Sequence, residues 1–145
     1  MGLFGVDAII SRERIWPVEV NPRYTASVEV LERAMRIHAI RWHAEACLTG
    51  TLPGSMKLHS DQYAGKVILY AGRSFTVDRS FVAFMANQNV AGDWPVIADI
   101  PRLGSSISCG KPVVTLMAAA ATAADVETRL RALVVMANRH INTDQ

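Results

Sequence analysis

Residues 4–23 read FGVDAIISRERIWPVEVNPR, and this stretch decides the fold of the N-terminal part of the chain. Two apolar runs flank the polar turn 11–14, which is the sequence pattern of a β-hairpin. If the two runs pair about this turn, Asp7 falls opposite Glu19. Side chains at positions i and i+2 of a strand share a face, so we expect Asn21 to join them on one side.

Asp7, Glu19 and Asn21 would bring hard oxygen donors together, and Mg²⁺ or Mn²⁺ prefers such ligands. Two carboxylates directly opposite each other repel unless a cation lies between them. Apolar residues alternate with the polar ones on both runs, which indicates that the polar face is not random. The alternative is the polar face of an exposed hairpin, which needs no metal.

Two amphipathic helices are predicted after the hairpin. Pro22 ends the strand, and Thr25 or Ser27 can cap the first helix. We expect the apolar side of this helix to carry Val28, Leu31 and Met35, and its polar side to carry Glu29, Glu32, Arg33 and Arg36. The second helix, over 37–48, should end at Gly50 and place four residues on one side: Ile40, Ala44, Cys47 and Leu48.

Residues 50–62 are rich in Gly, Pro, Ser and charge, and they are predicted to form a linker or exposed loop. Beyond this loop the pattern predicts short strands, at 66–71, 75–77, 96–100 and 113–118, with a short segment at 106–108. The run 81–86 fits helix and strand equally. The last element is a helix over 123–138, capped by Thr122, with one apolar face formed by Val126, Leu130, Leu133 and Ala137.

The pattern Val6-Asp7, then 16–23 (WPVEVNPR) and 25–32 (TASVEVLE), resembles the C-terminal part of the ATP-grasp catalytic domain. Within this superfamily, the motif is most similar to that of the carboxylase-related ATP-grasp proteins encoded near pterin and methanofuran cofactor genes. Roughly the first third of the chain carries this motif. The segment 99–116 is similar, more loosely, to the β-rich tail of the same proteins.

The resemblance implies an α+β fold. Residues 1–49 would be the C-terminal part of the catalytic domain, 50–62 a linker or exposed loop, and 63–145 a small antiparallel β-rich subdomain closed by a C-terminal helix. It also implies that Asp7, Glu19 and Asn21 hold Mg²⁺ or Mn²⁺, and that Arg23 faces the phosphate or the substrate. The alternative for Arg23 is a surface ion pair with Glu19 or Glu29.

ATP-grasp enzymes are mostly ligases that join a carboxylate to an amine through an acyl-phosphate. The resemblance therefore implies ATP and a small carboxylate or amine substrate for the complete enzyme. The nucleotide-binding lysines and the adenine pocket of that family have no counterpart in these residues, so we expect the chain alone to be inactive. A competing expectation is a binding or oligomerisation module that pairs with itself or with a nucleotide-binding partner chain.

The composition of the chain limits which partners and which cellular compartment are expected. The 145 residues are 50% hydrophobic and 19% charged, with a net charge of +2 that is scattered along the chain. This balance favours neither nucleic acid nor a membrane as a partner, and no apolar run approaches the length of a spanning helix. Cys47 and Cys109 lie apart without metal-ligand spacing, and we expect neither to be a nucleophile, because neither has a nearby basic partner that would activate it. Reduced thiols favour a cytoplasmic protein.

Overall fold

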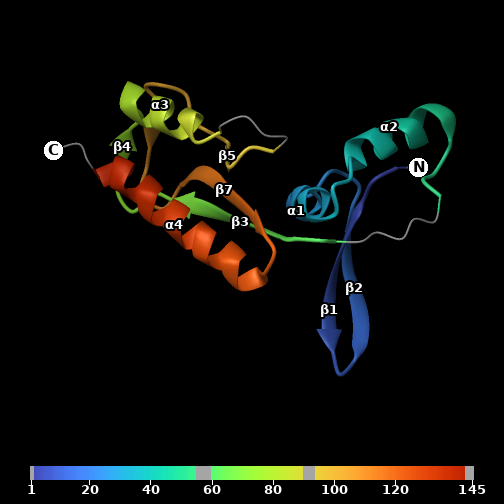
Figure 1. The fold of residues 1–145 in the computed structure, drawn as a ribbon. Helices are drawn as coiled ribbons and strands as arrows, with labels where there is room; N and C mark the ends of the chain where they lie inside the picture. The colour runs from blue at the N-terminus through green and yellow to red at the C-terminus, as the bar shows by residue number, and fades with distance from the viewer. Residues whose placement is uncertain (1, 55–59, 90–93, 143–145) are drawn as a thin grey trace. The chain divides into compact units, whose positions relative to one another are not determined.

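The computed structural model describes residues 2–54, 60–89 and 94–142. The chain divides into two compact units, Met1–Asp61 and Gln62–Gln145 (Figure 1). Both units contain α-helices and antiparallel β-strands, so the chain is α+β as predicted. Part of the predicted loop, residues 55–59, lies outside the described residues.

The N-terminal unit begins with a two-stranded antiparallel hairpin of β1 (Gly5–Ser11) and β2 (Arg14–Asn21). Arg12 and Glu13 form its two-residue turn, and both have positive φ, 47° and 64°. Positive φ at both turn residues matches the right-handed twist of the flanking strands. The hairpin extends away from the two helices of its unit, which explains why most of its side chains are exposed (Figure 1).

Helices α1 (Ala26–Met35) and α2 (Ala39–Thr49) follow the hairpin. Thr25 precedes α1 in extended conformation, although its side chain makes no capping bond. Gly50 ends α2 as predicted: its φ is 71°, and its N–H donates to Ala46 O. A left-handed residue at this position lets the chain leave the helix with its last carbonyls satisfied, and glycine adopts that conformation without strain.

The predicted faces of these two helices were right for Val28, which is buried, and wrong for several other residues. In α1, Glu32 is 6% exposed while Leu31 is 47% exposed. In α2 the buried residues are Ala39 and Ala46, and all four residues expected on the inner side are exposed: Ile40, Ala44, Cys47 and Leu48. The reason is a hydrogen-bond network around the Glu32 carboxylate, which draws a polar side chain inward and turns part of the apolar surface out.

The C-terminal unit is built on a three-stranded antiparallel sheet in the order β3-β7-β5. The central strand β7 (Pro112–Ala120) is buried along most of its length, between β3 (Tyr63–Tyr70) and the short β5 (Ile97–Ala98). A separate pair joins β4 (Phe75–Thr76) to β6 (Ser106–Ile107). The core of this unit includes the side chains of Val114, Leu116, Phe81, Met85 and Ala137.

Two helices cover this core. Residues 81–86, whose pattern fits a helix and a strand equally, belong to helix α3 (Arg79–Asn87). The cap of this helix, Asp78, accepts from Phe81 N at 2.7 Å. Helix α4 (Ala123–Asn142) lies along β3 and β7 (Figure 1). Thr122 caps it as predicted, with its Oγ1 accepting from Asp125 N at 3.1 Å.

The predicted strand 96–100 is shorter in the structure. Only Ile97 and Ala98 pair with β7, because Asp99 adopts a φ of 57° and turns the chain away. Before the strand, the Asn89 side chain bonds to Val96 N, Ile97 N and Ile97 O, in place of a neighbouring strand. In the part of the chain that the structure describes, no helix has both the length and the apolarity needed to cross a membrane.

Candidate metal-binding site on the N-terminal hairpin

The hairpin register places Asp7 directly opposite Glu19, which is the pairing that the sequence predicts. Side chains in such a pair start from Cβ atoms about 5 Å apart. Both carboxylates are exposed. Glu19 makes no hydrogen bond or ion pair with any other described residue, so none of these residues offsets its repulsion of Asp7.

Asn21 joins this pair on the same edge of the hairpin. Its Nδ2 donates to Asp7 Oδ2 at 3.2 Å, and its Oδ1 accepts from Arg23 Nη2 at 3.4 Å. The amide therefore orients one carboxylate and links it to the guanidinium. Asp7, Asn21 and Arg23 form a continuous polar chain, and Glu19 faces Asp7 across the hairpin.

A β-bulge lies next to the acidic pair. Asp7 pairs with Glu19 but Ala8 pairs with Pro17, so Val18 is an extra residue in β2. Proline cannot donate a ladder hydrogen bond, and strands accommodate it at edges or bulges. Bulges also re-aim neighbouring side chains and are common beside functional sites. Pro17 was the sequence signal for this irregularity, which the hairpin prediction did not include.

The donor set fits a hard divalent cation. The side chains of Asp7, Glu19 and Asn21 offer two carboxylates and one carboxamide oxygen, and the carboxylates lack an opposing positive charge of their own. Within residues 2–54, 60–89 and 94–142, no group of three or more His, Cys, Asp or Glu side chains could hold a metal ion. A cation here would thus depend on Asn21 and on ligands from outside the chain, such as water, for the rest of its shell.

Arg23 is exposed and makes only long contacts, to Asn21 Oδ1 and to Tyr24 O, both at 3.4 Å. Among the described residues it forms no ion pair with Glu19 or Glu29, the alternative considered from the sequence. Most of its five N–H donors remain available to an anion. The planar fork of a guanidinium suits a phosphate or carboxylate group.

Glu32 and Tyr24 fix the segment that follows the motif, and sequence reasoning missed them. Tyr24 Oη donates to Glu32 Oε2 at 2.7 Å, while Glu32 Oε1 accepts from Ala39 N at 2.5 Å. Glu32 thereby ties the residue after Arg23 to the start of α2. Burial, together with the Glu32 carboxylate, raises the pKa of the Tyr24 phenol well above its usual range. The sequence shows only that Tyr24 lies eight residues before Glu32, and this spacing does not by itself predict a contact.

The prediction that no basic partner activates Cys47 overlooked a histidine on the same helix. His43 lies one helical turn earlier, with its Nε2 3.8 Å from Cys47 Sγ. Leu3 N donates to His43 Nδ1 at 3.0 Å, so the neutral ring carries its proton on Nε2. Such a ring can donate toward the sulfur but cannot take its proton, so this pair is not a nucleophile activated by a base. Cys109 instead donates to Gly72 O at 3.3 Å.

The hairpin around the candidate site carries many exposed apolar side chains. The cross-strand pair Ile10 and Ile15 is 76% and 68% exposed, and Trp16 and Val18 are also more than half exposed. A two-stranded hairpin is at best marginally stable without further strands or packing. Apolar contacts with another surface would therefore stabilise this part of the chain.

Comparison of the chain with protein-family models and with curated proteins finds no match.

Proposed function

We propose that the N-terminal unit carries the divalent-cation-binding part of an ATP-dependent ligase that joins a carboxylate to an amine. The observation that carries this proposal is the pairing of Asp7 with Glu19, with Asn21 hydrogen-bonded to Asp7. The resemblance of residues 6–32 to ATP-grasp proteins supports the reaction class. Mg²⁺ or Mn²⁺ held by these residues would neutralise charge on the phosphates of ATP.

In this proposal each residue of the motif has a separate task. Asp7 and Glu19 bind the cation with their carboxylates, and Asn21 adds its carboxamide oxygen while its amide nitrogen orients Asp7. Arg23 is the catalytic residue, because its free guanidinium donors can hold the phosphate or the substrate carboxylate in place. The complete enzyme would form an acyl-phosphate, which the amine attacks with release of ADP and phosphate. Its adenine-binding part would come from another polypeptide segment.

Paramagnetic broadening by Mn²⁺ tests the cation site on this chain. In amide NMR spectra, Mn²⁺ should broaden the signals of Asp7, Glu19 and Asn21 first, because relaxation depends on distance from the ion. Glu19→Gln should weaken Mn²⁺ binding roughly tenfold or more, since a ligating charge is lost. Glu13→Gln is the matched control, because Glu13 lies in the turn of the same hairpin, and it should change nothing. Equal broadening in both variants would contradict the site.

ADP release tests the reaction. The isolated chain should hydrolyse no ATP, whereas in the complete ligase Asp7→Ala and Asn21→Ala should each lower turnover with ATP and the carboxylate. Arg23→Lys should lower it as well, because a lysine cannot form the planar fork. Unchanged turnover in the Asp7→Ala enzyme would contradict the assignment of Asp7 as a ligand of the cation.

A second candidate function is favoured by the exposed apolar hairpin. In this reading the chain is a non-catalytic binding or oligomerisation module, and the hairpin of one copy packs on that of a second copy through the Ile10–Ile15 region. The two outer edges of β1 and β2 also present unpaired backbone groups, which favour strand pairing. The oligomeric state in solution separates the two functions.

A further inference from the structure

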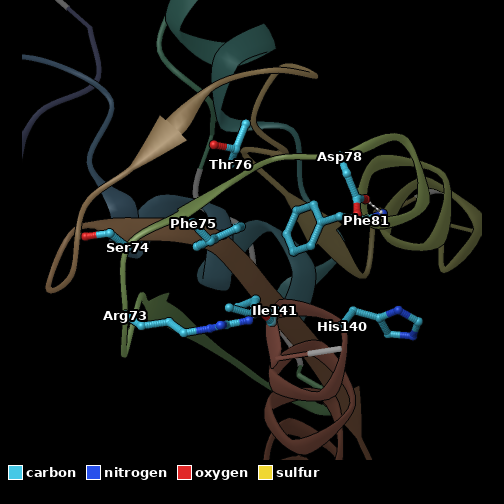
Figure 2. A pocket seen from close by; sticks show the side chains of 8 residues that line it. All are labelled: Arg73, Ser74, Phe75, Thr76, Asp78, Phe81, His140 and Ile141. Carbon is cyan, nitrogen blue, oxygen red and sulfur yellow. Dashed lines mark hydrogen bonds between the residues drawn. The ribbon is translucent and has the colours of Figure 1, made fainter. Parts of the chain in front are cut away.

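The C-terminal unit contains a cavity of about 320 Å³ that is separate from the hairpin site. Its walls come from the β3–β4 connection, from β4, from the start of α3 and from the end of α4 (Figure 2). Small-molecule sites in proteins begin at about this volume. The cavity is therefore large enough for a small metabolite.

Arg73 supplies a positive charge in this wall. Its Nη2 donates to Ile141 O at 2.7 Å, which holds the guanidinium against the end of α4. Its Nε is buried and has no hydrogen-bond partner among the described residues. The Nε atom is itself closed off, but Arg73 as a whole is only partly buried and lines the cavity, so a ligand there would meet the other donors of the guanidinium. The bond to Ile141 O uses one donor of the guanidinium and leaves others on its two Nη atoms for a ligand.

Two aromatic rings form an apolar wall beside this charge. The ring centroids of Phe75 and Phe81 are 5.8 Å apart, and their planes are tilted by 55°. Figure 2 shows the two rings side by side, with the Arg73 side chain running toward Ile141. Aromatic walls with one convergent polar group are typical of sites for small molecules that carry a flat apolar body.

The other ionisable side chains of the wall are already engaged. Asp78 Oδ1 accepts from Phe81 N at 2.7 Å and from Ser80 Oγ at 2.9 Å, so this carboxylate caps α3. The His140 ring stacks on Phe84, with centroids 3.4 Å apart, and points away from the two phenyl rings in Figure 2. The carboxylate of Asp78 disfavours a ligand with two negative charges near the single guanidinium.

We propose that this cavity binds a small monocarboxylate with a flat apolar body. The carboxylate would lie against the guanidinium fork of Arg73, which matches its planar geometry. The apolar body would lie against the partly buried Phe75, with the buried Phe81 ring beside it. This site does not depend on the cation site of the hairpin, and it takes a different class of ligand.

Titration of the full chain with benzoate, followed by amide NMR, tests the proposal. Benzoate should shift the amides of Arg73, Phe75 and Phe81 saturably, with a dissociation constant of about 1 mM or lower, as a ligand of this size allows. Benzyl alcohol, which keeps the ring without the charge, should bind at least about tenfold more weakly. Phenyl phosphate, with its second charge, should also bind more weakly. These comparisons need no substitution.

Substitutions then test whether Arg73 supplies the charge that binds benzoate. Arg73→Lys should weaken benzoate binding about tenfold, because the lysine keeps the charge but not the fork. Arg131→Lys is the control, since Arg131 lies on α4, outside the cavity, paired with Glu127. Phe75→Leu should weaken benzoate but leave acetate unchanged. Benzoate binding no tighter than that of benzyl alcohol, or undiminished in Arg73→Lys, would overturn the proposal.

Discussion

At the scale of single residues, Glu32 decides how the N-terminal unit is assembled. Four side chains in the described part of this unit are buried. Three are apolar, Val28, Ala39 and Ala46, and the fourth is the charged Glu32. Its two oxygens accept from Tyr24 Oη and Ala39 N. A buried carboxylate is tolerated only when such bonds replace water, so these contacts carry an unusual share of the stability of the unit.

Tyr24→Phe should lower the stability of the N-terminal unit by about 2 kcal/mol, because one hydrogen bond to a buried charged group is lost. Amide hydrogen exchange of α1 and α2 under mild denaturant measures this change. Tyr63→Phe is the control, because Tyr63 is exposed and lies in the other unit. Equal exchange rates in wild type and Tyr24→Phe would contradict a structural role for this bond.

The same bond predicts a pH dependence. Burial, followed by the Glu32 carboxylate, raises the pKa of Tyr24 in the folded chain. The bond therefore contributes fully below the unfolded phenol pKa of about 10 and is lost as pH rises above it. The difference in stability between wild type and Tyr24→Phe should be constant at neutral pH and should shrink in alkaline solution. A difference that grows with alkaline pH would have the wrong sign.

At the scale of elements, the packing of α4 on the sheet depends on one small residue. A Cβ at Gly65 of β3 would lie 2.9 Å from Val126 Cγ1 and 3.3 Å from Leu130 Cδ1. Both side chains belong to the apolar face that the sequence predicts for the last helix. Glycine at this position lets the helix approach the strand more closely than any other residue would.

Gly65→Ala should therefore destabilise the C-terminal unit by about 1–3 kcal/mol, because the added methyl group forces α4 to shift. Thermal unfolding followed by circular dichroism measures the change. Gly72→Ala is the matched control: its Cβ would meet open space, so the substitution should be neutral or slightly stabilising. Equal melting temperatures for the two variants would show that the contact is relieved without cost.

At the scale of the whole molecule, the two units differ in how their apolar surface is used. The C-terminal unit buries a large cluster between its sheet and helices, whereas the hairpin of the N-terminal unit leaves Ile10, Ile15 and Val18 exposed. Exposed apolar clusters of this kind mark interaction surfaces. The hairpin is therefore the part of the chain from which association would start.

Light scattering at increasing protein concentration tests this association. If the hairpin mediates it, the mass of the wild-type chain should rise with concentration, and Ile10→Lys with Ile15→Lys should keep the chain monomeric. Leu103→Lys is the control, since Leu103 is an exposed apolar residue of the other unit. A wild-type chain that stays monomeric at every concentration would argue against the oligomerisation module.

The sequence by itself determined the features that depend on neighbours along the chain. These are the hairpin with Asp7 opposite Glu19, the end of α2 at Gly50, and the cap of α4 at Thr122. Each follows from strand alternation, turn chemistry or helix capping, which act over a few residues. The ATP-grasp reading and its cation site stay predictions that rest on the same local motif.

Only the tertiary structure decided which surfaces turn inward. Glu32 is buried and Leu31 exposed because Tyr24 and Ala39, which lie outside helix α1, supply hydrogen bonds to the carboxylate. The cavity lined by Arg73, Phe75 and Phe81 likewise exists only because β4, α3 and α4 meet there. Periodicity describes one element at a time, whereas burial depends on what the other elements bring to it.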